Sequence, residues 1–393
     1  MNPLPLDGIR VLDFSRLLPG PYCTMLLADL GAEVIKIETP LAGDYARTIP
    51  DAFGGSVMFE TINRNKKSVA INYRHPRGQE LLLRLVQTLD VVLETFRPGA
   101  AKRWGIGYEA MAQANPRIVY CSLSGYGQDG PYANRAGHDL NYIAIGGLLA
   151  LNGIVGGPPI PPGVQIADLG GGMLAAIAIL AALVGRSSTG RGAYLDLAMI
   201  DAVTSWAAPM AGSFYAATGQ NPPRGQMPLS GGLPSYNVYE TADGKFISLG
   251  ILELHFWTAF CNAIQRNDLL ARQFDATAID ELAQLFRQHT RDEWLEMLRK
   301  VDACIEPVNE IGEMLHHPQL RHRGLVVQTE AGARIGSPFR FAARSDQAPA
   351  PSLGQHTLEV LEQLGLNKQE LRELDAAGVV KLSPVPAGPQ SGT

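Results

Sequence analysis

Residues 9–37 read Ile9-Arg-Val-Leu-Asp-Phe-Ser-Arg-Leu-Leu-Pro-Gly-Pro-Tyr-Cys-Thr-Met-Leu-Leu-Ala-Asp-Leu-Gly-Ala-Glu-Val-Ile-Lys-Ile37. The stretch begins and ends with short runs rich in β-branched and apolar residues, 9–14 and 33–37, which are typical of strands. Between them, residues 21–30 are apolar with helical spacing, and Gly31 follows as a usual helix stop. This order predicts two parallel strands joined by a crossover helix.

The same alternation continues through the first third of the chain. Further strands are expected over 68–72, 91–94 and 118–123, and a helix over 76–89. Strands separated by helices predict a parallel sheet with helices on both faces, so the expected fold class is α/β.

The second half of the chain changes character. A Gly/Pro-rich stretch over 153–163 leads into an apolar segment, and from residue 235 a hairpin and several amphipathic helices follow. The expected helices cover 254–265, 278–289 and 291–301. We therefore predict a large domain over 1–200 that is completed by 330–393, a linker over 201–230, and a smaller α/β domain over 231–329.

Charge and composition argue against several classes of protein. The 393 residues carry a net charge of −5, and neither nucleic acid nor a membrane surface is bound well without a basic excess. The apolar run 173–184 is shorter than the ~20 residues of a membrane span and is apolar almost all round, which predicts a buried core helix. The cysteines are too scattered for a zinc site, and no secretory signal is recognised, so we expect a cytoplasmic protein.

Two titratable residues lie beside glycine-rich segments. His138 follows a predicted strand, where α/β proteins place ligands, and a helix beginning there would favour a neutral imidazole that acts as a base. The alternative is a histidine that only caps or packs. Asp168 precedes Gly170-Gly171-Gly172, whose backbone N–H groups could approach an anion or an enolate oxygen. The alternative for Asp168 is a helix N-cap.

Glu253 and a set of basic residues are further candidates. A surface glutamate at a helix start is the ordinary explanation of Glu253. The basic residues adjoin predicted strands, so they form either a shared phosphate site or a solvated face, since arginine pairs geometrically with phosphate. They are Arg64, Lys66, Lys67, Arg97 and Arg103.

Other well-known site motifs are missing from the sequence. It contains no P-loop and no Gly-x-Ser-x-Gly elbow. Gly125, Gly127 and Gly130 match the dinucleotide pattern in form, but Pro131 follows at once and no helix opens within the motif. An NAD enzyme and a serine hydrolase are therefore disfavoured.

Longer motifs run through almost the whole chain. They are Leu6-Asp-Gly-Ile-Arg-Val-Leu-Asp-Phe, Leu27-Ala-Asp-Leu-Gly-Ala-Glu-Val-Ile-Lys-Ile-Glu, Asn63-Arg-Asn-Lys-Lys-Ser, Glu94-Thr-Phe-Arg-Pro-Gly, Ser124-Gly-Tyr-Gly-Gln-Asp-Gly-Pro and Thr241-Ala-Asp-Gly-Lys-Phe. With them the chain resembles the family III CoA-transferase superfamily. It is most similar to the α-methylacyl-CoA racemase branch, whose marks are Gly137-His-Asp-Leu-Asn-Tyr and Asp168-Leu-Gly-Gly-Gly here.

The resemblance implies a fold and roles for single residues. The fold would be a large CoA-binding domain with a Rossmann-like sheet, a small domain, and two subunits interlocked as a homodimer. His138 and Asp168 would be the acid/base pair, and Glu253 would support His138. The implied CoA contacts are Ala70, Ile71, Asn72, Tyr73, Glu94, Thr95, Phe96, Arg97, Arg103, Gly137, Asp139, Leu140, Asn141 and Tyr142.

The expected activity is that of an acyl-CoA racemase. His138 and Asp168 would serve opposite faces of the α-carbon of a 2-methylacyl-CoA, and the proton would move through an enolate. One alternative is a CoA-transferase in which Asp168 attacks the thioester; another is a protein that binds CoA without turning it over. Coenzyme A enters only as part of the substrate, and no metal or prosthetic group is expected.

Overall fold

A computed structural model describes residues 3–50, 55–329, 332–341 and 348–382. The chain divides into two compact units, each described here by itself. The first comprises residues 1–146, 163–206 and 335–393, and the second comprises 147–162 and 207–334. The second unit thus takes in 147–162, which the sequence predicted for the large domain, and 207–230, most of the predicted linker.

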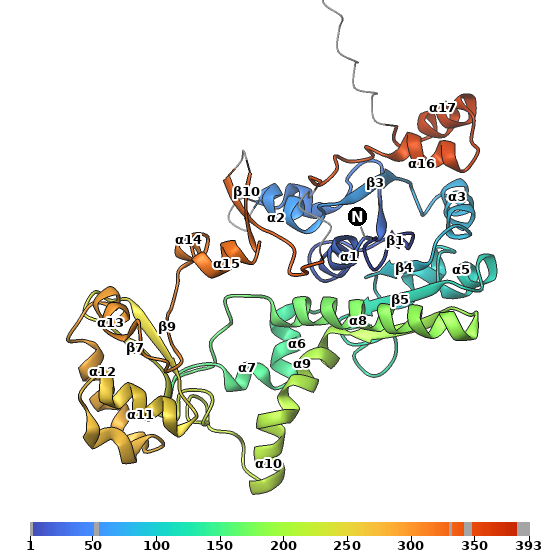
Figure 1. Ribbon diagram of the computed structural model, residues 1–393. Helices are drawn as coiled ribbons and strands as arrows, with labels where there is room; N and C mark the ends of the chain where they lie inside the picture. Colours follow the sequence, from blue (N-terminus) through green and yellow to red (C-terminus); the bar gives the residue numbers. More distant parts are fainter. Residues whose placement is uncertain (1–2, 51–54, 330–331, 342–347, 383–393) are drawn as a thin grey trace, which may run out of the picture. The chain divides into compact units, whose positions relative to one another are not determined.

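The first unit is built on a parallel sheet of six strands in the order β3-β2-β1-β4-β5-β6 (Figure 1). The strands are β1 (Arg10–Asp13), β2 (Glu33–Glu38), β3 (Lys66–Ala70), β4 (Val91–Glu94), β5 (Val119–Ser124) and β6 (Ala193–Ala198). The predicted mixed α/β class with a parallel sheet is confirmed. The predicted strand over 68–72 begins earlier, at Lys66, and the sequence prediction missed β6.

Helices cover both faces of this sheet. One face packs against α3 and α5 and against the C-terminal α16 and α17, and the other packs against α1 and α8. The helices of this unit are α1 (Pro19–Asp29), the 3-10 turn η1 (Tyr45–Thr48), α2 (Gly55–Ile62), α3 (Pro76–Val86), α4 (Ala100–Arg103), α5 (Tyr108–Ala114), α6 (Asp139–Ile145), α8 (Ile166–Thr189), α9 (Met199–Ala207), α16 (Thr357–Gln363) and α17 (Lys368–Ala376).

The crossover from β1 to β2 follows from its sequence. Pro19 stands at the start of α1, where its missing N–H costs no hydrogen bond. The helix ends before Gly31, whose φ of +111° is a conformation that side chains rarely adopt. The expected strand, helix and second strand over 9–37 are all present.

The end of the described chain returns to the sheet. Val380 forms an antiparallel bridge with Ile71, just beyond β3, and the Asn72 N–H donates to the Val379 carbonyl at 2.7 Å. The Ala70 N–H donates to Thr357 Oγ1 at 2.9 Å. The first and last parts of the chain therefore share one core.

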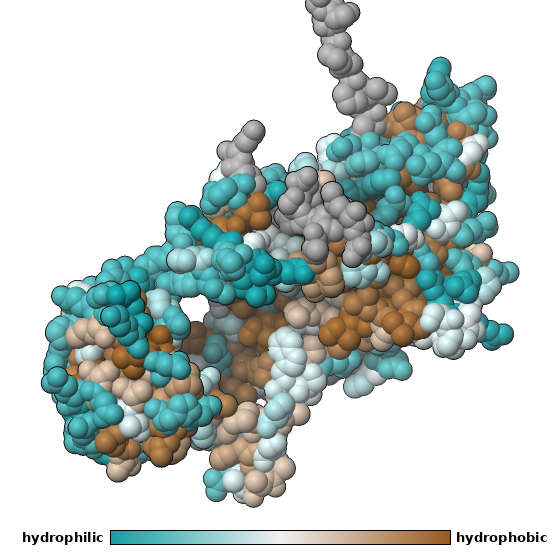
Figure 2. Space-filling view, viewed as in Figure 1, coloured by the Kyte–Doolittle hydropathy of each residue, from teal (hydrophilic) through white to brown (hydrophobic). Residues whose placement is uncertain are grey.

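Helix α8 is only partly buried within this chain, so the prediction of a buried core helix holds for one side of the helix alone. Ala175, Ala176 and Ile179 face the sheet and α1, but Ile177 and Val184 are 61% and 74% exposed. Figure 2 shows hydrophobic surface over the part of the unit where Figure 1 draws α8. By length and composition alone its 24 residues could cross a membrane, and 39% of the apolar window is buried.

The predicted homodimer, which light scattering would test, and the predicted lack of a membrane span stay predictions.

The second unit contains a three-stranded antiparallel sheet in the order β7-β8-β9 and a core of aromatic and aliphatic side chains from its strands and helices. The predicted hairpin is present as β7 and β8. Its elements are α7 (Leu148–Leu151), the π-turn η3 (Ala208–Gly212), α10 (Ser213–Thr218), β7 (Tyr236–Glu240), β8 (Phe246–Gly250), α11 (Leu254–Ala263), η4 (Asn267–Arg272), η5 (Ala276–Ala278), α12 (Ile279–Phe286), α13 (Arg291–Leu298), β9 (Ile305–Pro307), α14 (Ile311–Met314), α15 (Pro318–His322), β10 (Val326–Thr329) and β11 (Gly332–Ile335), the last of which reaches the boundary of the unit.

Candidate active site

A cavity of about 360 Å³ opens at the carboxyl ends of β1, β4 and β5. Strand order reverses between β1 and β4, and such a reversal leaves a crevice where open α/β sheets bind ligands. The loops that follow these three strands form most of the wall, and Tyr45, Asp168 and Met199 complete it. The cavity lies entirely within the first unit.

The structure brings His138 and Asp168 to this one cavity. His138 is the N-cap residue of α6, and its side chain is exposed. Asp168 lies in the first turn of α8 and is partly buried. An imidazole and a carboxylate from separate helices therefore face the same space.

Asp139 ties the two helix starts together. One of its carboxylate oxygens, Oδ1, accepts hydrogen bonds from the N–H groups of Ala167 and Asp168, at 2.6 and 3.1 Å. Burial raises the pKa of Asp168 to about 7, and the negative charge of Asp139 contributes to the rise. Asp168 is therefore present in both protonation states near neutral pH.

The wall beside His138 is built around the ring of Tyr142. A Cβ atom at Gly125 or Gly137 would lie 2.5 or 2.8 Å from that ring, so both positions require glycine. The Tyr142 hydroxyl donates to the Gly137 carbonyl at 2.5 Å, which fixes the backbone that leads into His138. Tyr126 packs edge-on against Tyr142 with ring centroids 5.0 Å apart.

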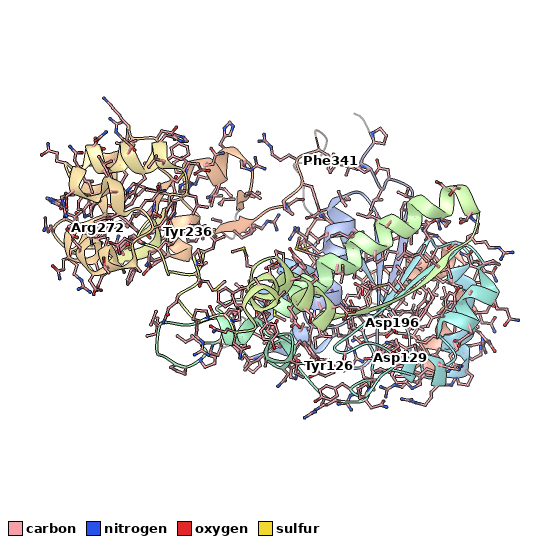
Figure 3. The ribbon with its side chains drawn as sticks, turned by 90° about the horizontal axis from the view of Figure 1, so that it is seen from below. Tyr126, Asp129, Asp196, Tyr236, Arg272 and Phe341 are labelled. Carbon is pink, nitrogen blue, oxygen red and sulfur yellow. The ribbon has the colours of Figure 1, made fainter. Side chains whose placement is uncertain are left out.

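Loop 125–130, which carries Tyr126, is fixed by β6. The Gln128 N–H donates to both carboxylate oxygens of Asp196, at 3.1 and 3.2 Å. Figure 3 labels Tyr126, Asp129 and Asp196 in this region. The strand that the sequence prediction missed thus anchors part of the cavity wall.

Gly170, Gly171 and Gly172 do not face the cavity with free N–H groups, so the expected enolate contact is wrong. All three lie inside α8, and the helical hydrogen bonds already begin with the Leu169 N–H, which donates to Gln165. Added Cβ atoms would meet the Trp206 ring at 2.6 Å, Met199 at 2.7 Å and the Pro19 carbonyl at 2.5 Å. The glycines allow close helix packing instead.

The implied CoA contacts separate into two groups. Some line the cavity: Thr95, Phe96, Arg97, Gly137 and Tyr142. Asp139, Leu140 and Asn141 form the adjoining first turn of α6, and exposed Arg103 ends α4.

The remaining implied CoA contacts are buried, except Asn72, which is partly buried. Ala70, Ile71 and Tyr73 are buried, and neighbouring Asn72 pairs with Val379 as described above. Glu94 is also buried, and its Oε2 accepts the Phe96 N–H at 2.6 Å. Burial raises the pKa of Glu94 to about 7. None of these residues is among the described residues that line the cavity.

The predicted shared phosphate site is wrong for Arg64, Lys66 and Lys67. The alternative, a solvated face, is also wrong for Arg64 and Lys66, which are buried. Arg64 is buried and pairs with Asp29 at 2.5 Å. The buried Lys66 ammonium contacts Asp13, and the part-exposed Lys67 pairs with Glu33 and Glu359. All three cations therefore pair with carboxylates of this chain.

A buried polar network shapes the loop after β1. Asp13 pairs with Lys66 at 3.3 Å, and Asp44 pairs with Lys36 at 2.9 Å. All four side chains are fully buried. Asp44 Oδ1 also accepts the Leu17 N–H at 3.2 Å. Leu17, which lines the cavity, has φ of +62°, a strained conformation for this residue type. The network holds that conformation.

Sequence reasoning missed several polar residues of the wall, among them Arg16, Tyr45 and Arg135. Arg16 follows the first strand directly, and this position was the available signal. Glu253 belongs to the second unit, as the N-cap residue of α11, so its role beside His138 stays a prediction.

We expect Asp139→Asn to lower the pKa of Asp168 below about 7. The asparagine oxygen can still accept both N–H groups, but the negative charge that helps to raise the pKa is lost. A ¹³C NMR titration of labelled aspartate carboxyls would measure the shift. In Asp139→Ala the acceptor is lost as well, so the unfolding midpoint should also fall. An unchanged titration of Asp168 in the asparagine variant would contradict the assigned cause.

Comparisons with known proteins give a consistent result. The model of CoA-transferase family III matches residues 6–357. α-Methylacyl-CoA racemase from Homo sapiens is 32% identical, over 98% of this chain and 100% of the racemase. Succinyl-CoA:glutarate CoA-transferase from Homo sapiens is 33% identical, over 96% of this chain and 90% of the transferase. The crystal structure of a CaiB/BaiF family protein from Brucella suis superposes with a TM-score of 0.81 and 30% identity, covering 92% of this chain and all of that one.

Proposed function

Because the chain belongs to CoA-transferase family III, we propose that it is an acyl-CoA racemase that interconverts the (R) and (S) forms of a 2-methylacyl-CoA. One observation carries this proposal: His138 and Asp168, from different helices, line a single cavity. A thioester α-proton is weakly acidic, so its removal needs a positioned base. Racemisation needs a second group that returns the proton on the opposite face.

The protonation behaviour of the site supports two-base chemistry. With a pKa of about 7, Asp168 can take up and release a proton near neutral pH. His138 would exchange the proton on the other face of the α-carbon. Exposed Arg97 and Arg103 provide charges that suit the phosphates of coenzyme A.

Deuterium exchange tests the proposal directly. Wild-type protein in D₂O is expected to incorporate deuterium at the α-carbon of (S)-2-methylacyl-CoA and to form the (R) epimer. His138→Ala is expected to lose epimerisation, because one of the two proton-transfer groups is gone. Mass spectrometry and chiral chromatography give the two readouts. A wild-type enzyme that exchanges no proton yet moves CoA between acids would refute the racemase.

A CoA-transferase is the second candidate, favoured by a relative of that activity at 33% identity, against 32% for the racemase. Asp168 would attack the thioester carbonyl and expel the CoA thiolate, forming a mixed anhydride. The thiolate would then attack the aspartyl carbonyl, which releases the acid and leaves an aspartyl-CoA thioester. Hydroxylamine would trap that adduct as a hydroxamate at Asp168, which a racemase would not form.

A further inference from the structure

The C-terminal segment 348–357 lies along β3, the edge strand of the parallel sheet (Figure 1). Side chains make several of the hydrogen bonds that hold it there. The Asn65 side-chain carbonyl accepts the Ala348 N–H at 2.8 Å, and Thr357 Oγ1 accepts the Ala70 N–H at 2.9 Å. We call residues 348–357 the strap, and its attachment depends on the state of the side chains that it uses.

His356 and Ser68 join the strap to β3 by two hydrogen bonds. The His356 N–H donates to the Ser68 carbonyl at 2.9 Å, and the Ser68 N–H donates to His356 Nδ1 at 3.2 Å. The second bond requires an Nδ1 atom without a proton, so it exists only while the imidazole is neutral with its proton on Nε2. In the imidazolium ion an Nδ1–H group would face the Ser68 N–H. Because Ser68 is fully buried, its N–H would then lose its acceptor without access to water.

The surroundings of His356 favour the neutral ring. Burial lowers the pKa of His356 below its usual value of 6.5; the carboxylate of Glu359 opposes this shift, and the ammonium of Lys67 adds to it. Lys67 also pairs with Glu33 on β2 at 3.0 Å. The stability that the neutral ring gives to the strap is therefore fully present above pH 6.5, and it is lost as pH falls through the lowered pKa.

Ser68 also connects the strap to the cavity wall. Its Oγ accepts the Gly354 N–H at 2.9 Å and donates to Glu38 Oε1 at 2.6 Å. The other carboxylate oxygen of Glu38, Oε2, accepts the Asp44 N–H at 2.9 Å. Asp44 directly precedes Tyr45, which lines the cavity. Because Ser68, Glu38 and Asp44 are all buried, a continuous chain of buried hydrogen bonds runs from the strap to the loop that carries Tyr45.

The strap also contacts this loop directly. Arg47 lies in η1, and its Nη2 donates to the Pro351 carbonyl at 3.0 Å. A Cβ atom at Gly43 would lie 3.2 Å from Leu353 Cδ1, so the strap packs against the start of the loop as well. Residues 43–47 are therefore held from the side of the strap at three places: by Glu38, by the Pro351 carbonyl and by Leu353.

Glu38 is not the group that responds to pH in this range. Burial alone would raise the pKa of Glu38, but the guanidinium of Arg47 and the ammonium of Lys36 lower it below its usual value of 4.5. Glu38 therefore stays ionised while His356 titrates, and it accepts its hydrogen bonds throughout. A change of the loop between pH 8 and pH 5 that depends on the strap is then due to His356.

We propose that His356 is a positioning residue for the cavity: the neutral imidazole holds the strap on Ser68, and the strap holds the loop that carries Tyr45. Protonation of His356 breaks the bond from the Ser68 N–H and loosens both segments. The inference rests on the proposed function in one respect, because it takes the cavity to be the acyl-CoA site. The loosening of the strap and the loop is measured without a ligand.

Hydrogen exchange followed by mass spectrometry tests the strap and the loop. Wild-type protein is compared with His356→Asn at pH 8 and pH 5, because Asn Oδ1 can accept the Ser68 N–H in place of Nδ1 but does not titrate. At pH 8 the two proteins are expected to exchange alike over 44–49, 65–70 and 348–357. At pH 5 these segments should exchange about 2- to 30-fold faster in wild type, the usual range for coupling through a network. His356→Ala, which has no acceptor, should exchange fast at both pH values.

Binding of a CoA thioester tests the effect on the cavity. Titration calorimetry with 2-methylpropanoyl-CoA at pH 5 is expected to show binding about 2- to 30-fold weaker for wild type than for His356→Asn, and equal binding at pH 8. Comparison of the two proteins at one pH cancels the titration of Asp168, which both share. His75→Asn is a matched control, since His75 Nδ1 accepts the Arg77 N–H at 3.2 Å at the start of α3 and not from the strap. It should behave as wild type.

The outcomes separate this inference from the proposed function. Equal exchange in wild type and His356→Asn at both pH values, or a protected strap in His356→Ala, would overturn the role of His356. Faster exchange of the strap without faster exchange of 44–49, or without weaker thioester binding, would show that the strap does not position the cavity. If no protein bound the thioester while exchange behaved as expected, the acyl-CoA site would be rejected and the link from strap to loop would stand. Circular dichroism at pH 8 would establish that each variant is folded.

Discussion

Asp168→Asn is expected to reduce α-proton exchange by about 10²- to 10⁴-fold, the usual contribution of a positioned acid or base. The change keeps the size of the side chain, and the backbone N–H can still donate to Asp139. What is lost is the only described carboxylate in the cavity wall. The initial rate of deuterium uptake from D₂O by a 2-methylacyl-CoA measures the effect.

A matched control is Asp129→Asn. Asp129 is exposed on the loop that carries Tyr126 and does not line the cavity, so its replacement should leave the exchange rate within about twofold. Exchange at the wild-type rate in Asp168→Asn would show that another group moves the proton.

Asp168→Asn should also change how the free energy of unfolding depends on pH. The pKa of Asp168 is raised from 3.8 to about 7 in the folded protein, so the folded state binds more protons than the unfolded chain between these values. The wild-type free energy of unfolding therefore loses the contribution of this group as pH rises through that window. In Asp168→Asn that loss should be absent, and urea titrations at pH 5 and pH 8 would measure the difference.

Lys66→Met is expected to destabilise the first unit by about 3–5 kcal/mol, the usual effect of leaving a buried charge without its partner. The Lys66 ammonium donates to Thr24 Oγ1 at 2.7 Å, to the Pro21 carbonyl and Asn63 Oδ1 at 2.9 Å, and to Asp13 at 3.3 Å. Methionine fills the space but leaves the Asp13 carboxylate buried beside one fewer cation. Urea unfolding followed by circular dichroism measures the loss.

The neighbouring lysine is a natural control. Lys67 has similar ion pairs, with Glu33 and Glu359, but all three side chains are at least a quarter exposed to solvent. Lys67→Met should therefore cost less than about 1 kcal/mol. Equal losses at the two positions would mean that burial of the Lys66 network does not matter. Combining Lys66→Met with Asp13→Asn should recover part of the stability, because no unpaired charge remains.

The fold was predictable where local pattern and tertiary structure agree. The segment 9–37 has strand and helix periodicity and a glycine stop, and it forms the expected unit. Lys66 shows where the method fails. Its charge indicates a surface residue, and its burial depends on Asp13, which lies 53 residues away in sequence. For helix α8 the prediction of burial fell short for another reason: apolar composition does not indicate which side of a helix another element covers.

The site was only partly predictable for the same reason. His138 and Asp168 stand in glycine-rich motifs and could be found from the residues together with the resemblance. Arg16 and Tyr45 join them because β1 lies beside β4 and β2, and strand order is not contained in any local pattern. The role of Gly170–Gly172 depended on neighbours such as Trp206 that only the packed structure supplies.

The bridge between Ile71 and Val380 has a consequence for biosynthesis. The sheet edge beside β3 cannot form its bridge to Val380 until that residue has left the ribosome. The whole second unit is translated between Ile71 and Val380. Until α16 and α17 have been synthesised, the hydrophobic side chains that they cover lack these packing partners. Limited proteolysis of stalled nascent chains should find this part of the core protected only after the C-terminal helices have emerged.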